Sequence, residues 1–246
     1  MRTANPALNN NTFAGARGTA TGGEVMTLQG TVNKTACLLV LLVGASSWTW
    51  SQMFQQGARV AAYLLPAAVV GFVVALVTVF KKSWAPVLAP IYAVTEGLLL
   101  GVISALFEAS YPGIVIQAVS LTFGTLAVLL VAYGTRMIPV TQNLRLGITA
   151  ATGAIALVYL VDMGLGFFGH RMPMIHESGW LGIGFSVFVV TLAAFNLVLD
   201  FDFIEQGSRT NQPKYMEWYA GFGLMVTLVW LYMEILRLLS MTRKCN

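Results

Sequence analysis

Long apolar segments recur through most of this chain, and they limit the folds that it can adopt. A transmembrane helix needs roughly 20 mainly apolar residues. Seven segments of the sequence meet this requirement, with approximate bounds at 35–53, 60–80, 84–107, 114–134, 145–168, 179–200 and 217–239. The connections between them are short and no soluble domain is inserted. The sequence therefore predicts an all-α integral membrane protein, built as a bundle of seven transmembrane helices.

The composition agrees with a chain that is surrounded mainly by lipid. Hydrophobic residues make up 57% of the 246 residues and charged residues only 10%, whereas a soluble domain carries about 25% charged residues. The formal net charge of +4 is small, and no stripe of Lys and Arg alternates with aromatic residues, so nucleic-acid binding is not indicated. The lipid bilayer is the predicted partner.

The chain divides by composition into three parts. Residues 1–34 are small and polar and lack the short apolar core of a signal peptide, so we expect a flexible N-terminal tail that stays attached. Residues 35–240 form the predicted helical bundle, and residues 241–246 form a short C-terminal tail. The two cysteines, Cys37 and Cys245, lie far apart, and a disulfide is not indicated.

The distribution of basic residues predicts the orientation of the bundle. With the N-terminus in the cytoplasm, nine Lys and Arg lie on the inner side and only two, Arg59 and Arg171, in the outer loops, as the positive-inside rule requires. A full crossing by the last segment puts Arg237, Arg243 and Lys244 outside, against this rule. A re-entrant last helix, broken near Gly221 and Gly223, is the alternative; the length of the segment favours a full crossing.

Carboxylates inside the apolar segments are the strongest functional signal. An ionised carboxylate in hydrocarbon costs at least about 2.5–3.5 kcal/mol, so such residues usually face a bundle interior or a water-filled cavity. Of ten Asp and Glu residues, five lie in or at the edge of predicted helices: Glu96, Asp162, Asp200, Asp202 and Glu234. They point to ion or proton handling. No nucleotide-binding loop and no hydrolase or metalloprotease motif is present, so we expect no enzymatic activity.

Asp200 and Asp202 close the sixth segment. Residues two apart on a helix point in different directions, so we expect Asp200 to face the bundle and Asp202 the inner surface. The alternative is that both residues, with Glu205, simply end the helix, although negative charge at a helix C-terminus is unfavourable. Asp162 lies near the outer end of the fifth segment, where a capping role and a pathway role are equally compatible with the sequence.

Glu234 has two candidate partners. Arg237, three residues later, is within reach on the same helix face. Asp200 on the preceding helix is the alternative; two such carboxylates in a poorly solvated site do not both stay ionised easily, so the pair would respond to pH near neutrality. Because 33 residues separate Asp200 from Glu234, a tight hairpin would place them at different depths, and residues 207–216 would have to form a long loop.

Glu96 lies beside a row of small residues on the third segment. Ala93, Gly97, Gly101 and Ala105 repeat every four positions and share one helix face, which allows close helix packing. The row is either a packing surface alone or a means of bringing Glu96 to another helix. His170 and His176 have neither the spacing nor the neighbours of a metal site, so we expect no structural metal and no cofactor.

Several segments together resemble the Bax inhibitor (transmembrane BAX inhibitor motif) family, in its bacterial branch. They are LVLDFDFIEQG at 197–207, PKYMEWYAGFGLMVTLVWLYMEILRLLS at 213–240, IYAVTEGLLLGVIS at 91–104 and RTANPAL at 2–8. The resemblance implies a six- or seven-helix bundle in the inner or an organelle membrane. It also implies a pH-sensitive calcium leak that is gated by two acidic residues on the last two helices. Asp200 and Glu234 match these positions, with Glu234 standing where the family usually has Asp.

These observations together favour a multi-pass protein of the bacterial inner membrane that lets cations, most plausibly Ca²⁺, move passively under the control of pH. The alternative is a regulatory membrane protein that acts on membrane-protein partners, such as a modulator of a membrane protease or of a stress response, with residues 1–34 as a docking segment.

Overall fold

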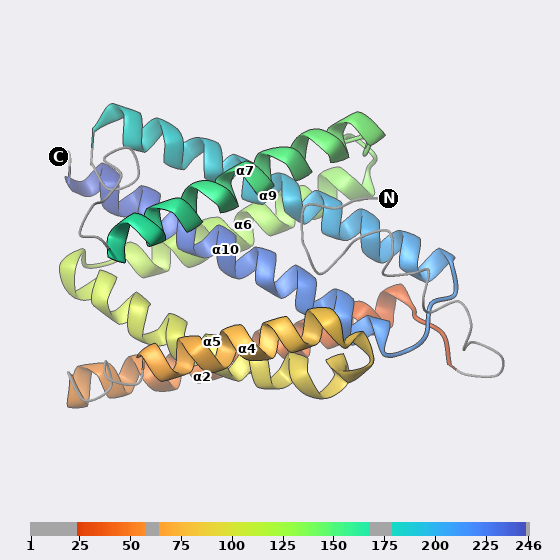
Figure 1. Cartoon of the computed structure of the whole chain (residues 1–246), viewed down its shortest axis with the longest axis horizontal. Coiled ribbons are helices and arrows are strands. Elements are labelled where there is room, and N and C mark those ends of the chain that lie inside the picture. Colours follow the sequence, from red (N-terminus) through yellow and green to blue (C-terminus); the bar gives the residue numbers. More distant parts are fainter. Residues whose placement is uncertain (1–23, 58–63, 168–178, 245–246) are drawn as a thin grey trace. The chain divides into compact units, whose positions relative to one another are not determined.

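The computed structural model describes residues 24–57, 64–167 and 179–244, and these residues are almost entirely helical (Figure 1). The elements are α2 (Leu28–Gln56), α4 (Leu64–Phe80), the short 3-10 helix η1 (Lys82–Trp84), α5 (Ala85–Ser110), α6 (Ile114–Gly134), α7 (Gln142–Phe167), α9 (Trp180–Arg209) and α10 (Met216–Lys244). Within the described ranges, the only β-type pairing is an isolated bridge between Val25 and Pro213.

The lengths of the helices confirm a multi-pass membrane protein. Six helices are long and apolar enough to cross a membrane, while α4, which directly follows the undescribed residues 58–63, has 17 described residues. Six of the seven predicted spans therefore meet the length requirement within the described ranges. The last helix, α10, runs without a break through Gly221 and Gly223, so the break that a re-entrant helix would need at these glycines does not occur.

Several helices extend beyond the predicted segments. α2 begins at Leu28, so the boundary of the predicted N-terminal tail at residue 34 is placed too late, because Thr27 caps the helix with its side chain. α9 continues to Arg209, nine residues beyond the predicted end at residue 200. α10 continues to Lys244, past the predicted boundary at residue 240. Residues 1–23 lie outside the described residues.

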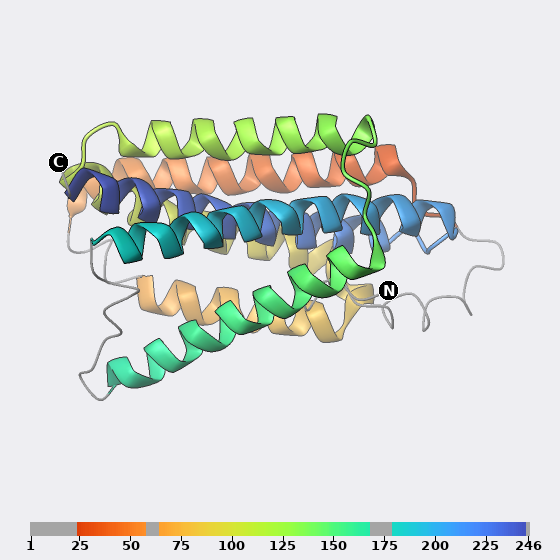
Figure 2. The ribbon, with the colours of Figure 1, turned by 90° about the horizontal axis from the view of Figure 1, so that it is seen from above.

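The chain forms two compact units, and the division between them passes through α9 and α10. Unit 1 consists of the described residues within Gly113–Asp202 and Thr227–Asn246, which include α6, α7 and most of α9 and α10. Unit 2 consists of the described residues from 24 to 112 and Phe203–Val226, which include α2, α4 and α5. Figure 2 gives a second view of the same helices.

Unit 2 is held together by the small residues of α5, against which α2 packs. A β-carbon added at Gly97 would meet the carbonyl of Leu42, and one added at Gly101 would lie 2.9 Å from the Thr49 β-carbon. The four small residues of the predicted row are all buried. The prediction of a packing surface is therefore confirmed, because only glycine lets the two helix backbones approach this closely.

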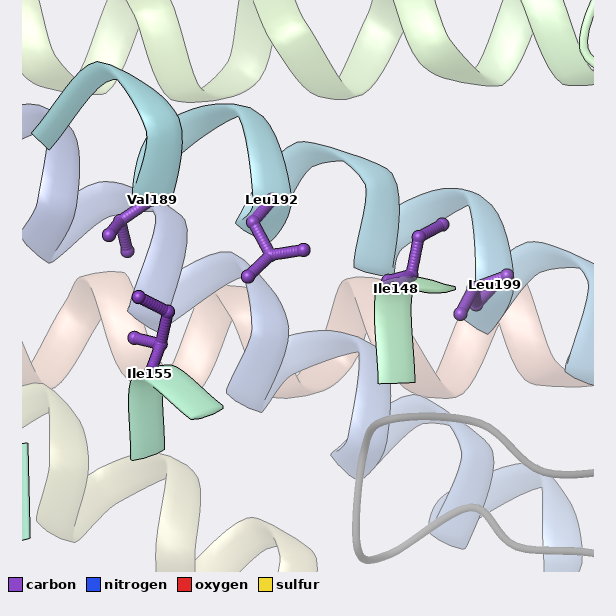
Figure 3. Close-up of a cluster of buried hydrophobic side chains, with 5 residues drawn as sticks. All are labelled: Ile148, Ile155, Val189, Leu192 and Leu199. Carbon is purple, nitrogen blue, oxygen red and sulfur yellow. The ribbon is translucent and has the colours of Figure 1, made fainter. Parts of the chain in front are cut away.

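Unit 1 has an apolar core between α7 and α9. Ile148 and Ile155 of α7 pack with Val189, Leu192 and Leu199 of α9, as Figure 3 shows. The two isoleucines are seven residues apart, so they lie on one face of α7. This apolar face determines which α7 side chains stand beside α9.

Candidate functional site

Polar side chains alternate with the two isoleucines on the same face of α7. Arg145, Thr152 and Tyr159 are each seven residues apart, and with Ile148 and Ile155 they follow the spacing of the a and d positions of a heptad. Each of the three polar residues contacts a polar partner on α9 or α10. We call these three contacts the polar ladder. Tyr159 lies 14 positions after Arg145, so at about 1.5 Å per residue the polar ladder extends about 21 Å along α7.

The first contact of the polar ladder is an ion pair between Arg145 and Asp202 of α9. Their side chains are only 14% and 16% exposed. Arg145 lies in the first turn of α7 and Asp202 near the end of α9, and each neutralises the other. Because the carboxylate is paired, α9 continues past Asp200 and Asp202, and the interpretation that these residues end the helix is wrong.

The middle contact joins Thr152 to Asn196. The amide nitrogen of Asn196 donates to the Thr152 hydroxyl at 2.9 Å, and also to the backbone carbonyl of Leu192 at 2.9 Å. Asn196 is buried, with 3% exposure. Four residues after Asn196, on the same face of α9, stands Asp200, whose exposure is 1%. Asp200 is thus buried within the apolar part of α9, in line with the expected interior position.

The third contact is a network of three residues around Tyr159. The Tyr159 hydroxyl donates to Glu234 Oε1 at 2.6 Å and accepts from Arg237 Nη1 at 2.8 Å. Arg237 also forms the predicted ion pair with Glu234, with 3.5 Å between Nη1 and Oε2. The Arg237 guanidinium lies 5.7 Å from the centre of the Tyr159 ring and 5.9 Å from that of Phe185. A cation among two aromatic faces and a carboxylate is well stabilised without bulk water.

The predicted partnership between Glu234 and Arg237 is therefore confirmed, whereas the one between Glu234 and Asp200 stays a prediction. The connection between α9 and α10 comprises only residues 210–215, so the long loop over 207–216 does not form. Asp200 lies nine residues before the end of α9, and Glu234 lies eighteen residues after the beginning of α10. At about 1.5 Å per residue, their distances from the connection along their own helices differ by about 13 Å.

The remaining candidate carboxylates occupy different surroundings. Glu96 hydrogen-bonds with Tyr92, one turn earlier on α5. A β-carbon added at Gly71 of α4 would lie 3.6 Å from Glu96 Oε2, so Glu96 does approach a second helix, but its hydrogen bond stays within its own. Asp162 is half-buried on α7, five residues before the described end of that helix.

The described residues contain no group of three or more His, Cys, Asp and Glu side chains arranged to hold a metal ion. His170 and His176 lie outside the described residues.

Sequence reasoning found the carboxylates but not their partners on α7. Thr152 and Tyr159 are common residues in membrane helices and carry no signal individually. Their seven-residue spacing from Arg145, with isoleucines between them, was the available signal. It becomes informative only when polar and apolar positions are read together as one face.

The fold and this site define the class of the protein: an all-helical, multi-pass membrane protein with buried carboxylates in its apolar helices. A family model described as Bax inhibitor 1 like matches residues 5–244, which is nearly the whole chain. The chain belongs to this family, so the resemblance read from the sequence is confirmed. Comparisons with curated proteins and with solved structures gave no match.

Proposed function

We propose that this protein is a passive cation leak of the bacterial inner membrane, with Ca²⁺ as the preferred ion and with a flux that depends on pH. The observation that carries the proposal is the polar ladder beside two buried carboxylates, Asp200 and Glu234, whose exposures are 1% and 5%. Carboxylate oxygens are the ligands that Ca²⁺ prefers. Buried acidic residues of membrane helices are usual features of ion and proton pathways. No enzymatic activity is part of the proposal.

In this proposal Asp200 and Glu234 respond to pH and the polar ladder supplies successive oxygen contacts. Asp202 is neutralised by Arg145, so it contributes less than Asp200. Glu234 is held between Tyr159 and Arg237, so the network sets how readily its charge is available to a passing cation. Glu96 and Asp162 are the secondary candidates for the pathway.

The test is a dye-based flux assay on liposomes that contain the purified full chain, run across pH with Ca²⁺, Na⁺ and K⁺. We expect Ca²⁺ entry to exceed that of the monovalent ions and to change with pH. Asp200→Asn should alter the flux or its pH midpoint more than Asp202→Asn does. Glu205→Gln is the control, because Glu205 pairs with Arg209, whose side chain is 65% exposed, at the end of α9. Equal effects of the two aspartate variants would contradict the assignment.

A double-mutant cycle decides whether Asp200 and Glu234 act as a pair. Asp200→Asn and Glu234→Gln are compared singly and together, with the pH midpoint of flux as the measured quantity. Non-additive shifts indicate coupling between the two sites. Additive shifts would mean that Glu234 acts only with Arg237 and Tyr159.

The alternative function, regulation through membrane-protein partners, predicts a different result from the same preparation. Deletion of residues 1–23 then has the same effect on cells as loss of the whole protein, while the liposomes show no flux with any of the three ions. A leak channel instead retains its flux in liposomes without these residues and loses its pH response with Asp200→Asn.

A further inference from the structure

Glu217, which has no role in the proposed leak, is a fully buried carboxylate in the first turn of α10, with 0% exposure. Its Oε1 accepts hydrogen bonds from the Thr27 backbone N–H at 3.0 Å and from the Thr27 hydroxyl at 2.9 Å. Lys214 Nζ lies 3.3 Å from the same oxygen. A buried carboxylate with two donors from a segment 190 residues away joins two distant parts of unit 2.

The carboxylate lies between the N-termini of two helices. Thr27 is the N-cap of α2, and its hydroxyl accepts from the Gly30 backbone N–H at 3.0 Å. A β-carbon at Gly30 would overlap the Glu217 carboxylate group, so this group lies directly on the first turn of α2. Negative charge is stabilised at a helix N-terminus, and here the N-termini of α2 and α10 act on the same carboxylate.

The residues just before α2 continue this contact along the connection between α9 and α10. The Met26 backbone N–H donates to the Gln212 carbonyl at 2.6 Å, and the Lys214 N–H donates to the Glu24 carbonyl at 3.1 Å. The isolated bridge between Val25 and Pro213 lies between these two bonds. We call residues 24–27 the docked segment. The docked segment is held by these backbone bonds, by the buried side chain of Met26, which is 1% exposed, and by the two hydrogen bonds from Thr27 to Glu217.

Basic side chains contact the first turn of α10. Lys214 lies 3.3 Å from Glu217 and 3.8 Å from Glu24. Lys34 of α2 lies over the Trp218 ring at 5.0 Å, and Lys82 of η1 lies 5.9 Å from the centre of the Tyr219 ring. The second oxygen, Oε2, is buried and accepts no hydrogen bond from the described residues. An amide in place of the carboxylate would therefore remove the attraction of Glu217 to Lys214 and to the two helix N-termini.

We propose that Glu217 is a charge-operated clamp. The charged carboxylate fixes the docked segment to the connection between α9 and α10, and replacing it by an uncharged group loosens the docked segment from the connection. The docked segment leads directly into α2 and bonds to the connection between the helices that carry Asp200 and Glu234, so the clamp determines how firmly α2 is joined to this connection. The clamp itself does not depend on ion conduction.

Hydrogen exchange of the full chain in detergent micelles tests the clamp. Glu217→Gln should raise the exchange rates of the Met26 and Thr27 amides by about tenfold, the size expected when a hydrogen bond to a charged group is lost. Glu205→Gln is the control, since Glu205 pairs with the 65% exposed Arg209 on the outside of α9. Unchanged exchange at both amides in Glu217→Gln would overturn the proposal.

Gly30→Ala tests the same clamp without altering Glu217. The added methyl group displaces the carboxylate, so the Met26 and Thr27 amides should again exchange about tenfold faster. Gly44→Ala is the matched control on α2, because a β-carbon there meets nothing within 4 Å. Equal protection in the two alanine variants would contradict the clamp. Loss of protection throughout α2 in both variants would also contradict it, since the faster exchange would then come from destabilisation of the whole α2 helix and not from displacement of Glu217.

The effect that the clamp has on ion flux, by way of the connection between α9 and α10, has its own test, which rests on the proposed leak. In liposomes, Gly30→Ala should change the Ca²⁺ flux at least about twofold relative to Gly44→Ala, a modest coupling between sites. If the unsubstituted protein shows no flux, the leak is refuted, and the hydrogen-exchange rates alone decide whether the clamp exists. Normal flux in Gly30→Ala, with faster exchange of the docked segment, would refute the coupling alone.

Discussion

Tyr159 shows how a single hydroxyl organises the buried charges of unit 1. It donates to Glu234 and accepts from Arg237, so it uses both of its hydrogen-bonding capacities at once. Glu234 and Arg237 are three residues apart on the same helix and would meet without Tyr159, but only through the longer 3.5 Å contact. The tyrosine thus links the pair to α7 and fixes the position of both charged groups.

Tyr159→Phe should lower the free energy of unfolding by about 1–3 kcal/mol, because a carboxylate and a guanidinium each lose a partner in a poorly solvated place. Thermal unfolding in detergent micelles measures the change. Tyr111→Phe, in the turn between α5 and α6, is the control and should be close to neutral. A Tyr159→Phe protein as stable as the Tyr111→Phe protein would mean that the network contributes nothing to folding.

The two arginine–carboxylate pairs of α9 should differ in their contribution to stability. The Arg145–Asp202 pair is 14% and 16% exposed, whereas Arg209 of the Arg209–Glu205 pair is 65% exposed. Arg145→Met leaves Asp202 as an uncompensated and mostly buried charge, so we expect a loss of at least about 1 kcal/mol. Arg209→Met should change stability by less than about 0.5 kcal/mol. Chemical unfolding measures both changes. Equal losses of the free energy of unfolding in the two variants would contradict the argument that the buried pair contributes more than the exposed one.

At the scale of the helices, the sequence predicted where each element lies better than where it ends. The seven apolar segments all correspond to helices, because about 20 apolar residues have few alternatives to a membrane helix. The ends were missed where a polar residue has a partner from far away. Asp200 seemed to close its segment, but the Arg145–Asp202 pair lets α9 continue. Leu28 begins α2 because Thr27 and Glu217 meet across 190 residues.

The dependence on partners that are distant in the sequence also explains which residues of the candidate site could be predicted. Asp200 and Glu234 were identified because a carboxylate in an apolar run is conspicuous by itself. Thr152 and Asn196 were not identified, since neither residue is unusual by itself and only their hydrogen bond to each other makes them part of the site. Partners on different helices depend on the rotation of each helix about its axis, which apolarity alone does not determine when a helix is apolar on most sides.

The packing of α2 on α5 gives a prediction at this scale. Gly97→Ala and Gly101→Ala should each destabilise the protein by about 1–3 kcal/mol, because the added methyl group would collide with the α2 backbone. Gly124→Ala in α6, where nothing lies within 4 Å of the added carbon, should be neutral or slightly stabilising. Chemical unfolding of the three variants measures the difference, and three equal values would contradict close packing at the α5 glycines.

At the scale of the whole molecule, the number of crossings decides on which side each terminus lies. Six helices are long enough to cross, and the described part of α4 has 17 residues, or about 26 Å at 1.5 Å per residue. Because the hydrocarbon core is about 30 Å thick, a crossing by α4 needs only a small contribution from the residues before it. Seven crossings put the termini on opposite sides, whereas six put them on the same side.

We predict seven crossings with the N-terminus in the cytoplasm. In a protein whose Cys37 and Cys245 are replaced by Ser, a single cysteine within residues 1–23 should react with a membrane-impermeant thiol reagent only after the cells are opened. Single cysteines at 169–178 or after residue 244 should react in intact cells. Labelling of the N-terminal cysteine in intact cells would refute the orientation, and protection of the C-terminal cysteine would refute the seventh crossing.

The alternation of polar and apolar residues on α7 also limits how unit 1 can move. If α7 slid along its axis by one turn so that Ile155 took the place of Tyr159, Ile155 would stand opposite Glu234 and Arg145 would stand opposite apolar residues of α9. Burying polar groups without partners costs several kcal/mol, so intermediate positions are strongly disfavoured. The next matching position is seven residues away, about 10.5 Å. Any gating motion of α7 in unit 1 must therefore be a tilt or a rotation that keeps this register, and not a sliding of α7 along its axis.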